Sequence, residues 1–346
     1  MQLLRNAPLA PYTSLGVGGN AETLITVETT DEIAPLLQSD PFASLYVLGY
    51  GANIVISDHG LPGLTLLMRS SGLQREGATI IAESGTWWDD LVQFAIEHGL
   101  WGLELTSAIP GSVGAAVVGN IAAYGQAVSD TLAWVDVLDT ETHEISRLPA
   151  ATLALTYRNS IFQTPEYKTK IILRAAFTLT AEPVKPVTYQ SLLDAADETE
   201  TLAGRRAGTL EARKRAGSLW DFRHAADFDK TAGSFFRNPL VSEEQAERIM
   251  QFDETGKTTE AIRKMNAIHG GDQKRVSAAH VLLAAGFSRG QSWGDVKLHD
   301  HNLLKVHNTG NATASQIYTV SNEIIATVKQ KLDITLTPEP HFIGEF

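Results

Sequence analysis

The chain has 346 residues, which is more than one ordinary hydrophobic core holds, so two or three domains are expected. Hydrophobic residues make up 43% and charged residues 20% of the sequence, a globular composition that excludes a disordered or fibrous chain. The 40 acidic and 28 basic residues give a net charge of −12, which argues against a dedicated nucleic-acid or anionic-membrane binder. With no cysteine, disulfides, cysteine nucleophiles, iron–sulfur clusters and thiolate zinc sites are excluded.

The N-terminal 65 residues predict a β-α-β-turn-β unit. Residues 21–28 are expected to form a strand, and residues 29–39 a helix with Thr30 as its N-cap and acids in its first turn. Residues 45–57 then read as strand, glycine turn and strand.

The N-terminal segment has none of the features of an export signal. It is interrupted by Pro8 and Pro11 and lacks the apolar run of a signal peptide. No run of about 18 apolar residues occurs anywhere in the chain. We therefore expect a soluble cytoplasmic protein.

The middle of the chain is richer in strands and the last third mixes helices with short strands. A helix is predicted over 86–101, stopped by Gly99, and a charged helix with a connector over 193–216. The predicted strands are 64–69, 79–85, 132–140, 143–149 and 170–180, followed by helices over 242–252, 276–286 and 314–332 and strands over 302–308 and 334–344. The pattern indicates an α+β protein in three parts, with boundaries at 1–65, 66–215 and 216–346.

The segment LGYGANIVIS (48–57) is the first candidate for a binding site. A strand is expected to end at Leu48, and Gly49 and Gly51 let the backbone turn and present N–H groups to phosphate oxygens. The segment lacks the third glycine and following helix of a dinucleotide-binding motif and the lysine of a phosphate-binding loop. Taken alone, it therefore predicts a β-hairpin turn.

The segment IPGSVGAAVVGNIAAYG (109–125) is the second candidate. No charged residue occurs between Glu104 and Asp130, and small residues dominate. The run from Pro110 to Gly114 is typical of a loop that opens a helix, where free N–H groups favour an anion. A planar, largely apolar cofactor needs the same small residues, and so does a tightly packed buried helix. The segment alone leaves both readings open.

Three further segments carry isolated polar residues. Taken one at a time, TYRNSIF (156–162) predicts an exposed β-turn, GSFFRNP (233–239) a strand end with a solvated arginine, and Glu339 between two prolines a surface acid.

Two charged clusters invite a functional reading that the sequence does not support. His299, Asp300 and His301 with His307 suggest a metal, but neighbours on a strand point to opposite faces, so a solvated loop is favoured. The basic cluster over 205–215 is typical of a solvated helix face.

Together and in this order, five segments closely resemble one enzyme family. They are GYGAN (49–53), the glycine-rich segment 109–125, YRNSIF (157–162), AGSFFRNP (232–239) and LTPEPHFIG (336–344). They resemble the UDP-N-acetylenolpyruvoylglucosamine reductases, flavoenzymes of bacterial peptidoglycan synthesis, and VTYQSLL (187–193) resembles the tyrosine loop of the family's type I branch. The resemblance implies a vanillyl-alcohol-oxidase-like (PCMH-like) FAD-binding region in two parts and a C-terminal α+β substrate-binding domain.

The resemblance also implies the reaction. NADPH reduces a non-covalently bound FAD and leaves, and UDP-N-acetylglucosamine enolpyruvate then accepts hydride from flavin N5 at C3 and a proton at C2. The product is UDP-N-acetylmuramate. The resemblance implies a monomer that acts on these small molecules, with no metal, nucleic acid or membrane partner.

Residue roles follow from the same resemblance. Ser234 matches the proton donor to C2. Arg158 matches the residue that pairs with the enolpyruvyl carboxylate, and Glu339 the acid that works beside it. The implied substrate-binding residues are Tyr157, Tyr189 and Asn238. The implied FAD contacts are Gly49, Tyr50, Gly51, Ala52, Asn53, Ile54, Ser107, Ile109, Pro110, Gly111, Gly114, Ala115, Gly119, Asn120, Ala123, Tyr124 and Gly125.

The sequence departs from the family's pattern in two places. The family usually carries a phosphate-contacting lysine shortly before AGSFF, whereas residues 213–222 read RKRAGSLWDF, where Lys214 or Arg215 would have to substitute. Residues 253–280 are also less typical, with His280 where an apolar residue or tryptophan is commoner.

Two other functions fit the sequence less well than the reductase does. An FAD oxidase or dehydrogenase of another alcohol often has a cysteine or histidine handle for covalent flavin, which this chain lacks in any obvious form. A non-catalytic nucleotide-binding protein would be expected to lose Arg158, Ser234 or Glu339, and all three are present.

Overall fold

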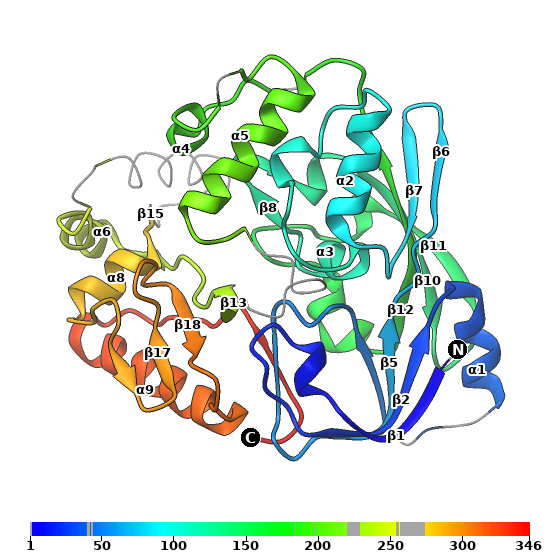
Figure 1. Ribbon diagram of the computed structural model, residues 1–346, viewed down its shortest axis with the longest axis horizontal. Helices are drawn as coiled ribbons and strands as arrows, with labels where there is room; N and C mark the ends of the chain where they lie inside the picture. Colours follow the sequence, from blue (N-terminus) through cyan, green and yellow to red (C-terminus); the bar gives the residue numbers. More distant parts are fainter. Residues whose placement is uncertain are drawn as a thin grey trace. The chain divides into compact units, whose positions relative to one another are not determined.

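The computed structural model describes residues 2–39, 42, 44–183, 185–196, 198–219, 229–253, 256 and 274–346 (Figure 1). The chain divides into two compact units. Unit 1 comprises Met1–Ala7, Ala21–Gly51 and Leu61–Ala225, and unit 2 comprises Pro8–Asn20, Ala52–Gly60 and Ala226–Phe346. The finer division of residues 1–215 into two FAD-binding parts remains a prediction.

A small, mostly parallel sheet forms the first part of unit 1. Its strand order is β1-β2-β5-β3, with β1 (Gln2–Pro8), β2 (Asn20–Val27), β3 (Leu45–Leu48) and β5 (Leu61–Met68). Both β2 and β3 run parallel to β5. Buried Ile25, Leu64 and Leu66 pack with Ile33 of α1 (Ile33–Ser39), because apolar side chains alternate along the strands and recur along the helix.

The helix predicted over 29–39 is confirmed, but its predicted N-cap is wrong. The segment begins with one 3₁₀ turn, η2 (Thr30–Glu32), before α1. The buried hydroxyl of Thr30 donates to Glu83 Oε1 at 3.2 Å, so it bonds to a distant strand rather than to its own helix.

An antiparallel five-stranded sheet forms the second part of unit 1. Two helices, α2 (Trp88–Glu97) and α3 (Val113–Val118), share one hydrophobic core with this sheet (Figure 1). In that core, Val117 of α3 lies with Ile80 and Phe177 of the strands. Gly99 ends the α2 segment with a φ of +69°, as predicted. The strand order is β11-β10-β12-β7-β6, with β6 (Leu73–Glu76), β7 (Thr79–Glu83), β10 (Leu132–Asp139), β11 (Ile145–Pro149) and β12 (Lys170–Thr178).

Five further elements of unit 1 lie within or near the glycine-rich segment 109–125. They are η3 (Glu104–Thr106), β8 (Ala122–Ala123), β9 (Gln126–Ala127), α4 (Gln190–Leu193) and α5 (Leu202–Arg215). Of these, α5 confirms the charged helix predicted within 193–216.

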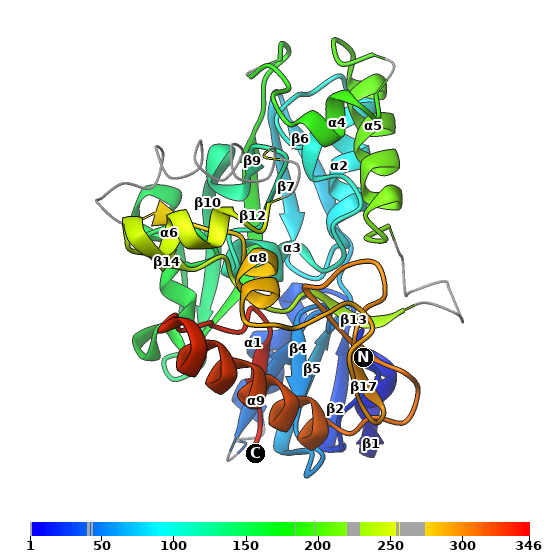
Figure 2. The ribbon, with the colours of Figure 1, turned by 90° about the vertical axis from the view of Figure 1, so that its left-hand side faces the viewer.

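Within the residues that the structure describes, unit 2 has a four-stranded sheet and three α-helices. The sheet has the order β13-β18-β17-β16, with β13 (Lys230–Ser234), β16 (Ser292–Trp293), β17 (Val296–Leu298) and β18 (Lys305–Asn308). The helices are α6 (Glu243–Met250), α8 (Ala278–Ala284) and α9 (Ala314–Leu332), and α8 and α9 share one core (Figure 2). These helices confirm the predicted ones.

Short strand pairs complete unit 2. Strand β14 (Leu240–Val241) pairs with β15 (Lys274–Arg275), and β4 (Ile54–Ile56) pairs in parallel with β19 (His341–Ile343). The strand predicted over 334–344 forms only at its end, because Pro338 and Pro340 remove two amide donors. None of the helices within the described residues has the length and hydropathy to span a membrane.

Candidate active site

The two glycine-containing segments meet in unit 1. A Cβ atom added to Gly49 would lie 2.5 Å from Ser112 Oγ, so only glycine allows the end of β3 to approach the start of α3 this closely. Ser112 is the N-cap of α3, and its hydroxyl accepts a hydrogen bond from the Ala115 amide. The predicted loop that opens a helix is therefore confirmed.

The hairpin predicted at residues 48–57 is wrong. Strand β3 pairs with β5 in unit 1, whereas β4 pairs with β19 in unit 2. The chain leaves unit 1 after Gly51 and enters unit 2 at Ala52. The two glycines therefore lie where the chain runs from unit 1 into unit 2. The chain turns there, and Gly51 has the left-handed φ of +67° that the turn requires.

The backbone of residues 108–125 is unusually rich in left-handed conformations. Their φ values are +56° at Ala108, +132° at Gly111, +40° at Asn120, +48° at Tyr124 and +91° at Gly125. A non-glycine residue pays roughly 1–2 kcal/mol for this conformation, so surrounding contacts must hold it. We call residues 107–125 together with Gly49–Gly51 the glycine-rich cluster.

The glycine-rich cluster fits FAD. Ser84 Oγ is buried beside it and has no hydrogen-bond partner within the described chain, while the Ser84 carbonyl accepts from the Gly114 amide at 2.8 Å. The small residues Gly114, Ala115 and Ala116 on α3 would let a flat ring approach the helix backbone closely. A buried hydroxyl without a partner is expected where a polar ligand completes the site.

The packing at Gly114 gives a direct test of how tight this cluster is. A Cβ atom there would lie 2.9 Å from Ser84 Cβ, so we expect Gly114→Ala to lower the free energy of unfolding by about 1–3 kcal/mol. Gly119→Ala is the matched control, since its Cβ would meet nothing closer than 3.5 Å and its φ of −86° suits alanine. Urea denaturation of the FAD-free proteins measures both, and equal stability of the two variants would contradict the tight packing.

Arg158 lies in a tight turn that is attached to the glycine-rich cluster. Thr156 and Asn159 exchange two backbone hydrogen bonds of 3.1 and 3.2 Å, which confirms the predicted β-turn. Arg158 has a φ of +54°, and its Nη1 donates to the Ala122 carbonyl at 3.4 Å. The turn is half-buried rather than exposed as predicted, because the side-chain Nδ2 of Asn120 donates to the Thr156 carbonyl and ties the turn to the cluster.

Tyrosine side chains gather next to Arg158's turn. The rings of Tyr124 and Tyr189 meet edge to face at 5.9 Å, and a Cβ at Gly125 would lie 3.5 Å from the Tyr189 ring. Burial raises the pKa of the Tyr189 hydroxyl, and Tyr157 raises it further; burial also raises the pKa of Tyr124. At neutral pH these hydroxyls therefore stay protonated and can donate hydrogen bonds.

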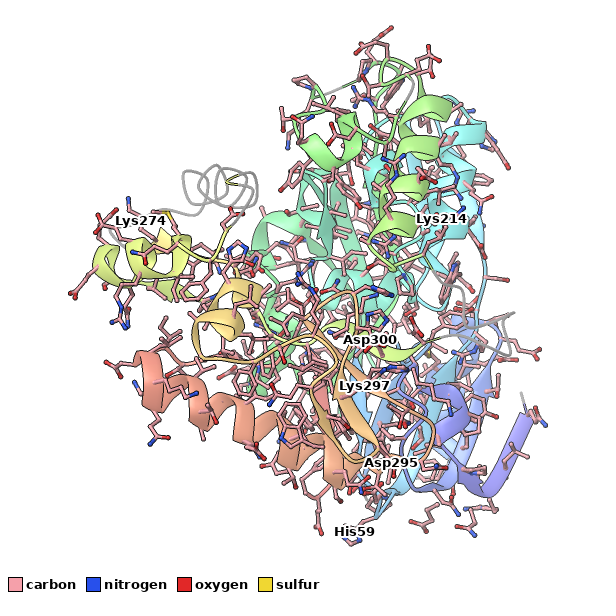
Figure 3. All side chains as sticks on the ribbon, turned by 60° about the vertical axis from the view of Figure 1, so that its left-hand side comes forward. His59, Lys214, Lys274, Asp295, Lys297 and Asp300 are labelled. Atoms are coloured by element: carbon pink, nitrogen blue, oxygen red, sulfur yellow. The ribbon has the colours of Figure 1, made fainter. Side chains whose placement is uncertain are left out.

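Sequence reasoning missed the basic residue that faces these tyrosines. Lys214 is exposed on α5 (Figure 3), and Arg215 pairs with Glu211 at 2.8 Å on the solvent side. Burial lowers the pKa of Arg213, which lies near Tyr124, and its Nε is buried with no hydrogen-bond partner in the part of the chain described. Nothing in a run of three basic residues reveals which one turns inward. Residues 220–222 of this stretch, and most of 253–280, lie outside the described residues.

Unit 2 brings Ser234 and Glu339 onto neighbouring segments. The Glu339 amide donates to the Phe235 carbonyl at 2.8 Å, and the Arg237 amide donates to the Thr337 carbonyl at 2.9 Å. Phe235 and Phe236 are buried and anchor this pairing. Strand β13 ends at the exposed Ser234, which confirms the predicted strand end, but Arg237 is half-buried rather than solvated and Glu339 is half-buried rather than a surface acid. We call this arrangement the Ser234–Glu339 cluster.

Two asparagines support the Ser234–Glu339 cluster. Asn53 Nδ2 donates to the Glu339 carbonyl at 3.1 Å, and the His341 amide donates to the Asn53 carbonyl at 3.1 Å, so Asn53 holds both sides of Pro340. Asn238 Oδ1 accepts from the Ala278 amide at the start of α8. Asn53 is a predicted FAD contact, and its link to Glu339 had no signal in the sequence.

The histidine loop after β17 has a structural explanation. Lys297 and Asp300 form an ion pair of 2.7 Å in this region (Figure 3). His299 is buried rather than solvated: its Nε2 bonds to Asp229 Oδ2 at 3.1 Å and its Nδ1 accepts from the His301 amide. Across the described residues, no group of three or more potential ligands is arranged to hold a metal.

Known proteins resemble the chain over its whole length. Two family models match: "UDP-N-acetylenolpyruvoylglucosamine reductase, C-terminal domain" over residues 224–343 and "FAD binding domain" over residues 21–148. UDP-N-acetylenolpyruvoylglucosamine reductases from Streptomyces avermitilis and Mycobacterium ulcerans are 32% and 34% identical, and each comparison covers 99% of this chain and 96% of the relative. A crystal structure of the reductase from Thermus caldophilus, 24% identical, matches with a TM-score of 0.65 over 99% of this chain and 98% of that one. These matches confirm the predicted α+β fold, with its FAD-binding region and C-terminal domain.

Proposed function

Because the chain belongs to the UDP-N-acetylenolpyruvoylglucosamine reductase family, we propose that it uses NADPH to reduce UDP-N-acetylglucosamine enolpyruvate to UDP-N-acetylmuramate. Its FAD-binding domain identifies FAD as the cofactor. The observation that supports the proposal most is the pairing of the strand end at Ser234 with the segment that carries Glu339.

The glycine-rich cluster is the part of the chain that would hold FAD. Its amides and small residues would contact the pyrophosphate and the ring, with Ser84 Oγ as a further polar group. When bound, FAD supplies the hydride, taken from NADPH, to C3 of the enolpyruvyl group.

Three side chains carry the remaining chemistry. The guanidinium of Arg158 binds the enolpyruvyl carboxylate and stabilises the negative charge that develops as C3 is reduced. Glu339 works beside Arg158 at the same carboxylate. Asn53 Nδ2 donates to the Glu339 carbonyl and so fixes the backbone of Glu339. Ser234 donates a proton from its Oγ to C2, which completes the saturation of the double bond.

Three polar side chains and one arginine bind the nucleotide part of the substrate. Tyr157 and Tyr189 donate hydrogen bonds from their hydroxyls. Burial raises the pKa of the Tyr189 hydroxyl and so favours its protonated, donating form. Asn238 uses its Nδ2, since its Oδ1 accepts from Ala278. Arg213 supplies the positive charge for the diphosphate that the family's lysine usually provides, because its Nη2 bonds only to the uncharged Ser218 carbonyl and its Nε is buried with no hydrogen-bond partner among the described residues. We propose a cytoplasmic monomer with no nucleic-acid, membrane or metal partner.

Visible absorption under anaerobic conditions tests the proposal. Purified protein is expected to be yellow, to bleach on addition of NADPH, and to regain its colour when UDP-N-acetylglucosamine enolpyruvate is added. Protein that bleaches but never regains colour with this substrate would favour an oxidase or dehydrogenase of another alcohol. Protein that stays colourless with added FAD would contradict the assignment of the glycine-rich cluster.

A further inference from the structure

The segment Gly102–Ala108, which leads into the glycine-rich cluster and overlaps its first two residues, is held at both ends by carboxylates. The Gly102 amide donates to Glu104 Oε2 at 2.8 Å, and the Ala108 amide donates to Asp89 Oδ1 at 2.6 Å. Both donors have left-handed backbone, with φ of +126° and +56°. Between them, the Leu105 amide donates to Gln126 Oε1 at 2.7 Å. Side chains, rather than a regular backbone ladder, therefore contribute much of the shape of this segment.

Two consecutive arginines of α5 pair with these two carboxylates. Arg205 Nη1 lies 3.0 Å from Glu104 Oε1, and the two side chains are only 3% and 1% exposed. Arg206 forms a two-pronged pair with Asp89, with both Nη–Oδ distances at 2.8 Å. Because consecutive helical residues point about 100° apart, one turn of α5 reaches both ends of the segment.

Asp89 bonds to Arg206 and to the Ala108 amide at the same time. Burial opposes the ionisation of Asp89, but the hydrogen bonds from Arg206 and from the Ala108 amide outweigh it and hold the pKa of Asp89 below that of an ordinary aspartate. The ionised carboxylate is the stronger acceptor for the Ala108 amide. Without Arg206, the buried charge of Asp89 would lose its ionic partner and turn toward water, leaving the strained backbone at Ala108 without its hydrogen bond.

We propose that Arg206, acting through Asp89, is a positioning residue for the flavin-binding segment Ser107–Gly111, so that the docking of α5 sets the affinity for FAD. The inference rests on the proposed function in taking Ser107–Gly111 as a flavin contact. Arg206 itself touches no reacting group. The basic run on α5, which the sequence predicts to be a solvated face, instead shapes the cofactor site at Arg205 and Arg206 and is solvated at Lys214 and Arg215.

Dissociation of FAD from the holoenzyme, followed by flavin fluorescence on dilution, tests this role. Arg206→Met is expected to raise the Kd for FAD at least tenfold and to change the shape of the flavin absorption band. Arg215→Met is the matched control: it makes the same change on the same helix, at an exposed residue paired with Glu211, and should change the Kd less than twofold.

Two milder variants separate positioning from a general loss of stability. Arg206→Lys keeps the charge and should recover part of the affinity, while Asp89→Asn keeps the acceptor for Ala108 and should raise the Kd less than Arg206→Met does. In the double variant Asp89→Asn/Arg206→Met, the fold-increase in the Kd for FAD should be smaller than the product of the fold-increases in the two single variants, because no unpaired charge remains.

The outcomes distinguish this inference from the proposed function. Arg206→Met and Arg206→Lys proteins that bind FAD as tightly as the wild type, at an unchanged or lowered thermal midpoint, would overturn the positioning role. A wild-type protein that does not bind FAD would overturn the proposed function and the inference with it.

Discussion

Replacing Ser234 with alanine is expected to leave the reduction of flavin by NADPH near the wild-type rate and to slow reoxidation by UDP-N-acetylglucosamine enolpyruvate by about 10³-fold. The first half-reaction needs no proton at C2 of the substrate, whereas the second does. Ser234 is exposed at the end of β13 and its neighbours Phe235 and Phe236 anchor the strand, so removal of the hydroxyl leaves the packing intact. Anaerobic stopped-flow absorbance measures the two rates separately.

A second serine in the same unit provides the control for this prediction. Ser292 is exposed on β16, and its hydroxyl donates to the Gly294 carbonyl at 3.0 Å. Ser292→Ala should leave both half-reactions unchanged. If Ser234→Ala slows both half-reactions equally, structural damage is the cause; if reoxidation keeps its rate, another group donates the proton.

Elements whose stability depends on local pattern could be predicted from the sequence. The helix over 314–332 has the predicted bounds, because Ile317, Val320, Ile324 and Val328 recur at helical spacing and all four are buried. Thr313 begins it with a capping box that includes Gln316. Such signals are contained within a few turns of chain, so they survive without knowledge of the tertiary structure.

Pairings between distant segments could not be predicted in the same way. The stretch 48–57 reads as a hairpin because the strands that pair with β3 and β4 are β5 and β19, and β19 lies at the other end of the chain. Likewise, the basic run 205–215 is predicted to be solvated because the carboxylates that pair with Arg205 and Arg206 are distant in sequence. They belong to Glu104 and Asp89. Burial of a charge depends on its partner, and a local pattern does not contain the partner.

The candidate site was identified by resemblance, and the structure adds its local support. Ser234 and Glu339 are each unremarkable in their own segments, and it is the hydrogen bonds between residues 235–237 and 337–339 that bring these segments together. The supporting contact from Asn53 and the inward position of Arg213 had no counterpart in the sequence pattern.

Replacing Arg158 with lysine is expected to slow reoxidation by the enolpyruvyl substrate by roughly 10²-fold while the reduction by NADPH changes little. Lysine keeps the positive charge, but it loses the planar fork that binds both carboxylate oxygens as negative charge develops. The turn should persist, because the substitution leaves its closing contacts in place. These are the backbone hydrogen bonds between Thr156 and Asn159 and the hydrogen bond from Asn120 Nδ2 to the Thr156 carbonyl. The left-handed φ of +54° is no more strained for lysine than for arginine.

A matched arginine tests whether this effect belongs to the site. Arg147 in the same unit forms two hydrogen bonds with Asp136, at 2.7 and 2.9 Å, and stacks on Trp134 on an exposed strand. Arg147→Lys loses the same fork and should leave both half-reactions at the wild-type rate. If Arg158→Lys reoxidises as fast as Arg147→Lys, the carboxylate is held by other groups, and the charge-stabilising role proposed for Arg158 is wrong. If only Arg158→Lys reoxidises slowly, and the lower rate persists at saturating substrate, the two-pronged contact of arginine stabilises the transition state more than it strengthens substrate binding.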